Sequence, residues 1–406
     1  MRVAYFSPLP PERTGISEYS ELLVPALARR IELEVVPRGS TRDADVCLYH
    51  VGNNPDAHGW IVEALRKRPG VVVLHDFVLH HLVAGLTLGR RDGPGYLGAM
   101  QREAGVPGRL LAHGVLDGIV PPLWEVRPED FPLAGEVLEH AAKPGGGLIV
   151  HSRYVAERAV AAGYDGRLSR IPLPAWPDPA VAAEKVAGDP VVGCFGNINA
   201  SKRITQLLEA FAALRSRHSE ARLLLVGADL DARLVDRELE GVERIDYVDE
   251  RRLWALMGAC DFCVSLRAPT MGETSGSAIR ALVLGKPLVV SETGWFAELP
   301  DDVALKVPVD AHEAETLGAA LELLASDTST RATMSAAARE YVRREHDLDR
   351  VADAYAAALE EAAGGEAARD AVVGEVAQAA ADVGVAAEGE EAAEIARLLN
   401  EVRLGG

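Results

Sequence analysis

CVSLRAPTMGETSGSAIRALVLGKPLVVS, residues 263–291, predicts a strand, a loop, a helix and a second strand, in that order. Residues 263–266 form a short apolar run, and residues 269–275 form a loop of mostly small side chains. Apolar positions three and four apart predict a helix over residues 277–284, which a glycine and a proline then end. The β-branched run at residues 288–291 is typical of a buried strand in a parallel sheet.

Small residues stand directly before and at the start of the predicted helix: Thr274, Ser275, Gly276 and Ser277. Because they carry no bulky side chain, a ligand can approach the backbone, and the free amides with the helix dipole favour an anion. We interpret this loop as a pocket for a diphosphate-linked sugar. The alternative is an ordinary turn in which a serine caps the helix.

The composition bounds the class of protein. A chain of 406 residues with 48% hydrophobic side chains suits two domains with separate cores. The net charge of −19 argues against a nucleic-acid partner, because phosphates require a basic surface, and it weakens docking on anionic lipid. We expect no secretory leader, no transmembrane segment and no disulfides, and therefore a cytoplasmic protein.

Strand-like and helix-like segments alternate along the chain, which predicts parallel α/β sheets. A proline-rich stretch at residues 173–190 predicts a linker between a first domain, residues 1–172, and a second, residues 191–338. We expect residues 339–361 to form one long helix and residues 362–406 to form an Ala/Glu-rich helical tail.

Two apolar stripes run along the tail. The first consists of Val372, Val373, Val376, Ala380 and Val383, and the second of Ile395, Leu398, Leu399 and Val402. Two helices folding back on the parent domain would bury these stripes, and so would self-association or another partner. The sequence leaves both alternatives open.

Loops after predicted strands carry further candidates, because α/β sheets bind ligands at the carboxyl ends of their strands. Gly15 opens a helix, so its backbone can approach a phosphate or a sugar. Asn197 is followed by Lys202 and Arg203 just before another helix, where cations do not stabilise the helix. A bound diphosphate would explain these charges. A plain proline–glycine turn and a solvated Lys–Arg pair are the respective alternatives.

The opening stretch adds three charged residues to the expected donor site: Arg267, Glu273 and Arg280. Glu273 lies in the loop beside the small residues, so its carboxylate can accept hydrogen bonds from sugar hydroxyls. The two arginines add positive charge near the expected phosphate.

In the first domain, His75 ends a buried strand and precedes Asp76. An imidazole there can orient a hydroxyl or share a proton near neutral pH, whereas a core histidine satisfied by Asp76 is the alternative. We assign His75, Asp76 and Tyr19 to the acceptor side. The neighbouring His80 and His81 diverge on a helix, which argues against a two-histidine metal site.

We expect no metal. The Cys-x-x-Cys pair at Cys260 and Cys263 lacks the second pair that a structural zinc site needs. Four aspartates occur with Asp-x-Asp spacing: Asp43, Asp45, Asp229 and Asp231. Capping and solvation explain them, because one pair precedes a strand and the other precedes a helix expected around residues 233–239. We find no dinucleotide fingerprint and no P-loop.

Together these segments resemble glycosyltransferase family 4, retaining enzymes of the GT-B fold, over most of residues 1–360. The resemblance rests on the Gly15 loop, VLHD (73–76), VHSRYVAE (150–157), FGNINASKR (195–203), LVG (225–227), ACD (259–261) and residues 273–291. It implies two Rossmann-like domains facing across a cleft, with the last long helix returning to the first domain. The second domain would hold a nucleoside-diphosphate sugar, and the first would hold the acceptor.

The resemblance also implies roles for single residues. Lys202 would neutralise the diphosphate, Glu273 would hold donor hydroxyls, and the amides of residues 275–277 would cap the phosphate. His75 would lie beside the reacting centre. It implies no cofactor and no metal, with a UDP- or GDP-sugar as the donor, and the departing phosphate would help to deprotonate the acceptor hydroxyl.

Two positions depart from the family pattern. A second glutamate usually follows the first after seven intervening residues and holds the ribose, but Arg280 lies one residue short of that position. The arginine usual after the glycine of the second domain is Asn197 here, which leaves Arg203 or Arg267 as substitutes. A nucleotide-sugar-binding homologue without activity and a GT-B nucleotide-sugar epimerase are therefore the alternatives to a transferase.

Overall fold

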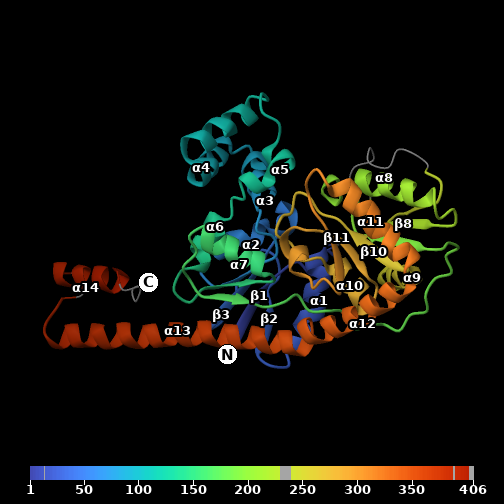
Figure 1. Ribbon diagram of the computed structural model, residues 1–406. Helices are drawn as coiled ribbons and strands as arrows, with labels where there is room; N and C mark the ends of the chain where they lie inside the picture. Colours follow the sequence, from blue (N-terminus) through green and yellow to red (C-terminus); the bar gives the residue numbers. More distant parts are fainter. Residues whose placement is uncertain (13, 229–238, 387–388, 402–406) are drawn as a thin grey trace.

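The computed structural model describes residues 1–12, 14–228, 239–386 and 389–401. Within them the strands form two parallel sheets of six strands each, one in each half of the chain (Figure 1). This confirms the predicted class of two α/β domains. Asp229, Asp231 and nearly all of the helix expected around residues 233–239 lie outside the described residues.

The first sheet has the order β2-β1-β3-β4-β5-β6. Its strands are β1 (Arg2–Phe6), β2 (Glu32–Val35), β3 (Val46–Val51), β4 (Val71–Leu74), β5 (Gly147–Val150) and β6 (Leu168–Arg170). Alternate side chains of β1 enter different cores, since Val3 and Tyr5 face one side of the sheet and Ala4 and Phe6 face the other. Burial on both faces explains why these strands are continuous apolar runs.

Helices α1 (Gly15–Leu27), α2 (Pro55–Lys67), α6 (Gly135–Ala141) and α7 (Arg153–Ala161) flank this sheet. Between β4 and β5 the chain makes an excursion through α3 (His80–Thr87), α4 (Gly93–Leu116) and α5 (Leu123–Val126). The excursion has its own small core around Tyr96, and α4 and α5 project away from the sheet (Figure 1).

The second sheet has the order β12-β11-β10-β7-β8-β9. Its strands are β7 (Val191–Phe195), β8 (Arg222–Val226), β9 (Val242–Ile245), β10 (Phe262–Ser265), β11 (Leu288–Ser291) and β12 (Ala304–Val307). Its helices include α8 (Ile204–Arg215), α9 (Glu250–Ala259), α10 (Gly276–Val283) and α11 (Glu313–Ser326). The strand–loop–helix–strand prediction for residues 263–291 is confirmed within one residue at each boundary.

The helical end of the chain differs from the prediction. A single helix over residues 339–361 is wrong, because α12 (Thr328–Glu345) ends and α13 (Leu348–Asp382) begins within that range. At the break a new helix, α13, begins with an N-cap, because the Asp347 carboxylate accepts a hydrogen bond from the amide of Arg350 at 2.9 Å. Residues 173–190, the predicted linker, contain neither helix nor strand.

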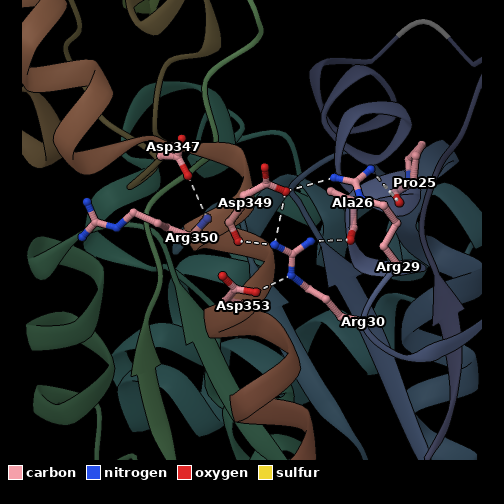
Figure 2. Close-up of polar contacts among 8 residues, drawn as sticks. All are labelled: Pro25, Ala26, Arg29, Arg30, Asp347, Asp349, Arg350 and Asp353. Carbon is pink, nitrogen blue, oxygen red and sulfur yellow. Dashed lines mark hydrogen bonds and ion pairs between the residues drawn. The ribbon is translucent and has the colours of Figure 1, made fainter.

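Helix α13 returns to the first domain, as the resemblance implies. Arg29 and Arg30 at the end of α1 bind Asp349 and Asp353 on α13 (Figure 2). Between the same two helices the hydroxyls of Tyr19 and Tyr355 lie 2.6 Å apart, and both side chains are buried. The inner face of α13 thereby joins the core of the first sheet.

The tail does not fold back on the parent domain. Helix α13 continues past the sheets, and α14 (Glu390–Glu401) turns back over its far end (Figure 1). Among residues 373–386 and 389–399 none is buried, and Val383 is 80% exposed. Of the two alternatives that the sequence left open, folding back on the parent domain is therefore excluded for these residues. Val402 and the side chain of Val372 lie outside the described part, and self-association stays a prediction.

Candidate functional site

The topology of the second sheet brings two predicted loops together. In the order given above, β7 and β10 are neighbours from which the chain continues in opposite directions, to β8 on one side and β11 on the other. Open α/β sheets bind ligands at such a switch point. The loop after β7 carries Lys202, and the loop after β10 carries Arg267 and Glu273.

Lys202 is the buried cation of this site. It ends the short helix η3 (Ala200–Lys202), is 7% exposed, and donates from Nζ to the carbonyl of Phe195. Gly196 is required beside it, because a Cβ at that position would lie 2.8 Å from Lys202 Nζ and 3.8 Å from Ser277 Oγ. Burial lowers the pKa of Lys202 to about 8. The lysine therefore releases its proton more readily than an exposed lysine does.

The N-terminus of α10 faces the same glycine. Ser275 caps the helix by accepting from the amide of Ala278 at 3.3 Å, and its hydroxyl lies 3.2 Å from that of Ser277. The first-turn amides of Gly276 and Ser277 have no partner within the helix. The hydroxyl of Thr274 is enclosed and has no hydrogen-bond partner among the described residues. These groups fit an anion with several oxygens.

Arg267 and Glu273 form an ion pair next to Lys202. Arg267 Nε lies 2.6 Å from Glu273 Oε1, and both side chains are largely buried. The other carboxylate oxygen accepts from the Thr270 hydroxyl at 3.1 Å and from the Met271 amide at 2.7 Å. Glu273 is therefore held in one orientation, and its side chain retains 22% exposure for a ligand.

On the opposite side, the end of β4 in the first domain presents His75 and Asp76. His75 Nε2 lies 3.0 Å from Nδ1 of His50, and Asp76 accepts from the amide of Asn53 at 2.8 Å. The interpretation of His75 as a histidine satisfied by Asp76 is thus wrong, because each has another partner. Burial and the nearby charge of Glu273 raise the pKa of Asp76 to about 7.

The two domains meet at this point. The amides of Phe77 and Val78 donate to the carbonyl of Met271 at 2.7 and 2.9 Å. Gly272 makes the approach possible, because its φ is +83° and a Cβ there would lie 2.8 Å from Cβ of Phe77. His75, Asp76, Arg267, Glu273 and Lys202 consequently belong to one region.

Three predicted site residues have other partners. Arg203 forms an ion pair with Glu313 of α11. The guanidinium of Arg280 lies 3.7 Å above the ring of Trp176 and 2.7 Å from Glu18 of α1, so it joins the two domains. Tyr19 is fully buried against α13, with its ring 5.0 Å from that of His75. It lies behind the histidine.

The other predicted positions are accessible. Gly15 starts α1 and is exposed, with no atom within 4 Å of a Cβ placed on it. Asn197 is exposed beside Gly196. Of the two proposed substitutes for the missing arginine, Arg267 therefore lies near Lys202, and Arg203 is engaged elsewhere.

The sequence analysis missed the residues that join the domains. Glu18 and Trp176 hold Arg280, and the Glu298 carboxylate accepts from the amides of Arg153 and Tyr154 at the start of α7. Each contact joins residues more than 100 positions apart, so no local pattern could have identified it. His50 was also missed, because it reads as one more position of a buried strand.

A cavity of about 110 Å³ lies elsewhere, against Phe6, Tyr49 and Trp60 on the α2 side of the first sheet. Arg42 and Arg68 at this cavity bind Glu34 and backbone carbonyls, and Lys67 and Glu63 also line it. None of the predicted site residues lines it. Among the described residues there is also no cluster of three or more metal-ligating side chains, and no helix long and apolar enough to cross a bilayer.

Residues 189–327 match the family model described as glycosyl transferases group 1. This range contains the whole second sheet and the Lys202, Arg267 and Glu273 loops. No curated protein sequence matches the chain.

Solved structures show the fold of the whole chain. It is similar to sucrose-phosphate synthase from Thermosynechococcus elongatus, with a TM-score of 0.60, 17% identity and coverage of 89% of this chain and 98% of that one. HepE from Anabaena, in complex with UDP and glucose, has a TM-score of 0.57, 16% identity and coverages of 89% and 100%. WaaG, a glycosyltransferase of lipopolysaccharide biosynthesis, has a TM-score of 0.54, 14% identity and coverages of 88% and 99%. The chain has the GT-B fold.

Proposed function

We propose that this protein transfers a sugar from a nucleoside-diphosphate sugar to an acceptor hydroxyl, with retention of anomeric configuration. The observation that carries the proposal is the buried Lys202 beside the N-terminus of α10 at the switch point of the second sheet. The match of this domain to group 1 glycosyl transferases supports it.

The chemistry follows from the charges. The bond between the anomeric carbon and the diphosphate oxygen breaks, and negative charge develops on the departing diphosphate. Lys202, Arg267 and the amides of Gly276 and Ser277 stabilise that charge. The acceptor oxygen forms the new bond to the anomeric carbon, and its proton passes to the departing phosphate. Glu273 holds hydroxyls of the transferred sugar.

We propose a UDP- or GDP-sugar as the donor and no requirement for a metal. HepE, which shares the fold, was solved in complexes with UDP and with UDP-glucose. Lys202 and Arg267 supply positive charge at the place where a divalent ion would otherwise be needed. Activity that survives excess EDTA would support this proposal, and loss that added magnesium restores would contradict it.

The first experiment is a thermal-shift screen against UDP-, GDP-, ADP- and dTDP-sugars, because a bound donor raises the apparent stability. The donor that stabilises the wild type should fail to stabilise Lys202→Met. The matched control is Lys185→Met, which removes an exposed lysine. An equal shift in both variants would contradict a diphosphate at Lys202.

A second experiment separates transfer from mere binding. Hydrolysis of the stabilising donor is followed by proton NMR, which reports both turnover and the anomer first released. Release of the donor's own anomer supports a retaining transferase. Tight binding without turnover of any donor, with or without simple sugar acceptors, would favour the non-catalytic homologue.

A further inference from the structure

A buried histidine pair lies behind the candidate site. His50 is in β3, and His75 follows the neighbouring strand β4, so the parallel pairing of these strands sets their rings side by side. Nδ1 of His50 and Nε2 of His75 are 3.0 Å apart. His50 is 0% exposed and His75 is 7% exposed.

Neutral rings can form this hydrogen bond in two ways. If His50 donates from Nδ1, then His75 accepts at Nε2 and carries its proton on Nδ1. If His75 donates from Nε2, then His50 carries its proton on the far nitrogen, Nε2. Both rings are neutral, because burial lowers the pKa of each, and the surrounding imidazoles of His58 and His151 lower it further.

The surroundings of His50 Nε2 decide between the two forms. This nitrogen is enclosed, has no hydrogen-bond partner among the described residues, and lies among the rings of Tyr5 and Tyr19. A proton there would be a buried N–H without an acceptor, which native structures rarely contain. The first form leaves only a bare lone pair at that position.

Two other histidines of this protein show that the interior tolerates such a lone pair. His151 and His346 each have Nδ1 within 2.9 Å of a backbone carbonyl, which can only accept, so Nδ1 of each must carry the proton. Each then has an unprotonated Nε2, and both of these nitrogens are enclosed and unpaired. His50 fits the same pattern.

We infer that His50 holds His75 in the tautomer with its proton on Nδ1, so that His75 offers the substrate an N–H donor. Nε2 of His75 is engaged by His50, and His75 retains 7% exposure, so Nδ1 is the ring nitrogen left for a ligand. His75 then donates to an oxygen of a sugar or acceptor hydroxyl and does not act as a general base. His50 is a positioning residue. This role of His75 rests on the proposed function, whereas its tautomer does not.

The direct test is the pair of ring ¹⁵N chemical shifts of His75, measured in the full-length protein with His75→Asn used for assignment. We expect a protonated Nδ1 and an unprotonated Nε2 near neutral pH, and loss of this fixed pattern in His50→Leu. A proton on Nε2, or an imidazolium, would overturn the inference. A correct tautomer in a protein without turnover would leave the inference intact and reject the proposed function alone.

Kinetics test the donor role. His75→Asn keeps an N–H group and should retain activity within about tenfold of the wild type, the value of one hydrogen bond. His75→Asp, which can only accept when ionised, should lose far more.

His50→Leu should lower kcat, and His50→Asn, whose amide can donate to His75, should restore part of it. His140→Leu removes a histidine on α6 whose Nδ1 also lies 2.8 Å from a backbone carbonyl but which does not contact His50 or His75, so it should leave kcat/KM unchanged. Equal losses in His75→Asn and His75→Asp would overturn the inference.

Discussion

At the scale of single residues, burial shifts the pKa values of charged groups in the candidate site. Lys202 has little water around it, and the nearby guanidinium of Arg267 adds to the effect of burial on its pKa. Burial lowers the pKa of Lys202 but raises the pKa of Asp76, because in each case it disfavours the charged form. Both groups therefore titrate close to neutral pH.

Binding of UDP should take up a proton near the Lys202 pKa of about 8. The free lysine is partly neutral there, and the diphosphate favours the ammonium form. Titration calorimetry in two buffers with different ionisation enthalpies measures the uptake, and affinity should fall as pH rises through this value. Lys202→Met should abolish the uptake. Unchanged uptake in that variant would contradict the assignment.

Asp76→Asn should stabilise the protein at neutral pH by about 1 kcal/mol or more. The folded-state pKa of Asp76, about 7, exceeds its unfolded value, so the folded state binds more protons and stability falls as pH rises between the two values. Thermal unfolding of both proteins at acidic and neutral pH measures the difference, which should vanish in acid. Asp45→Asn is the control, because Asp45 also accepts a backbone amide but is exposed. Equal shifts for both variants would refute the explanation.

The sequence predicted candidate site residues that the fold brings together but could not assign every arginine. Lys202, Glu273 and His75 were predicted from their positions after strands, and topology alone brings such loops together. Arg203 and Arg280 were predicted from the same kind of sequence position, near loops that follow predicted strands. Their partners Glu313 and Glu18 lie 110 and 262 positions away, so only the tertiary structure shows that the two guanidiniums are already paired.

At the scale of elements, α13 contributes mainly through its buried face. Tyr355 and Leu359 are fully buried, and each such side chain contributes roughly 1.5–3 kcal/mol. The ion pairs of Arg29 and Arg30 in Figure 2 involve exposed aspartates, although Arg30 itself is only 19% exposed, and pairs with solvent-exposed partners contribute about 1 kcal/mol or less. Apolar burial therefore outweighs the ion pairs.

A chain that ends after residue 364 should unfold at nearly the wild-type temperature, because it keeps every residue of α13 that is buried among those whose burial is described. A chain that ends after residue 347 should fail to fold, because it exposes Tyr19 and the neighbouring core of the first sheet. Circular dichroism and calorimetry measure both. A large destabilisation of the longer chain would show that the tail packs more than its exposure indicates.

The boundaries of the final helices show what the sequence conceals. The apolar spacing runs on through residues 339–361, so the periodicity alone does not reveal a break. The decisive signal is Asp347, whose carboxylate caps a new helix, and an aspartate there also fits an exposed helical position. Helix α13 also continues beyond the predicted end at residue 361, to Asp382.

At the scale of the whole molecule, the two domains are in contact through main-chain groups. The Met271 carbonyl accepts hydrogen bonds from two amides of the first domain. The Glu298 carboxylate accepts two more from amides at the start of α7. The linker crosses between the domains and supplies Trp176 to Arg280. Main-chain contacts depend on the approach of the backbones and not on the side chains that a sequence pattern reports, which is why the predicted fold did not include them.

Gly272→Ala should lower kcat/KM by about tenfold or more, because the added carbon would meet Phe77 and hold the two domains apart. Steady-state kinetics measure the effect, and small-angle scattering with UDP should report a less compact molecule. Gly163→Ala is the matched control, since Gly163 also has a positive φ but open space around it. If both variants lost activity equally, backbone strain and not domain separation would be the cause.

The path of α13 also has a consequence for synthesis on the ribosome. The first domain is translated long before the segment around Tyr355 that covers its Tyr19 face. At usual elongation rates the delay is on the order of ten to forty seconds. Throughout that interval the nascent first half presents an uncovered apolar surface, which makes it a client for chaperones that bind nascent chains, and a premature stop before α13 would leave that surface permanently open to aggregation.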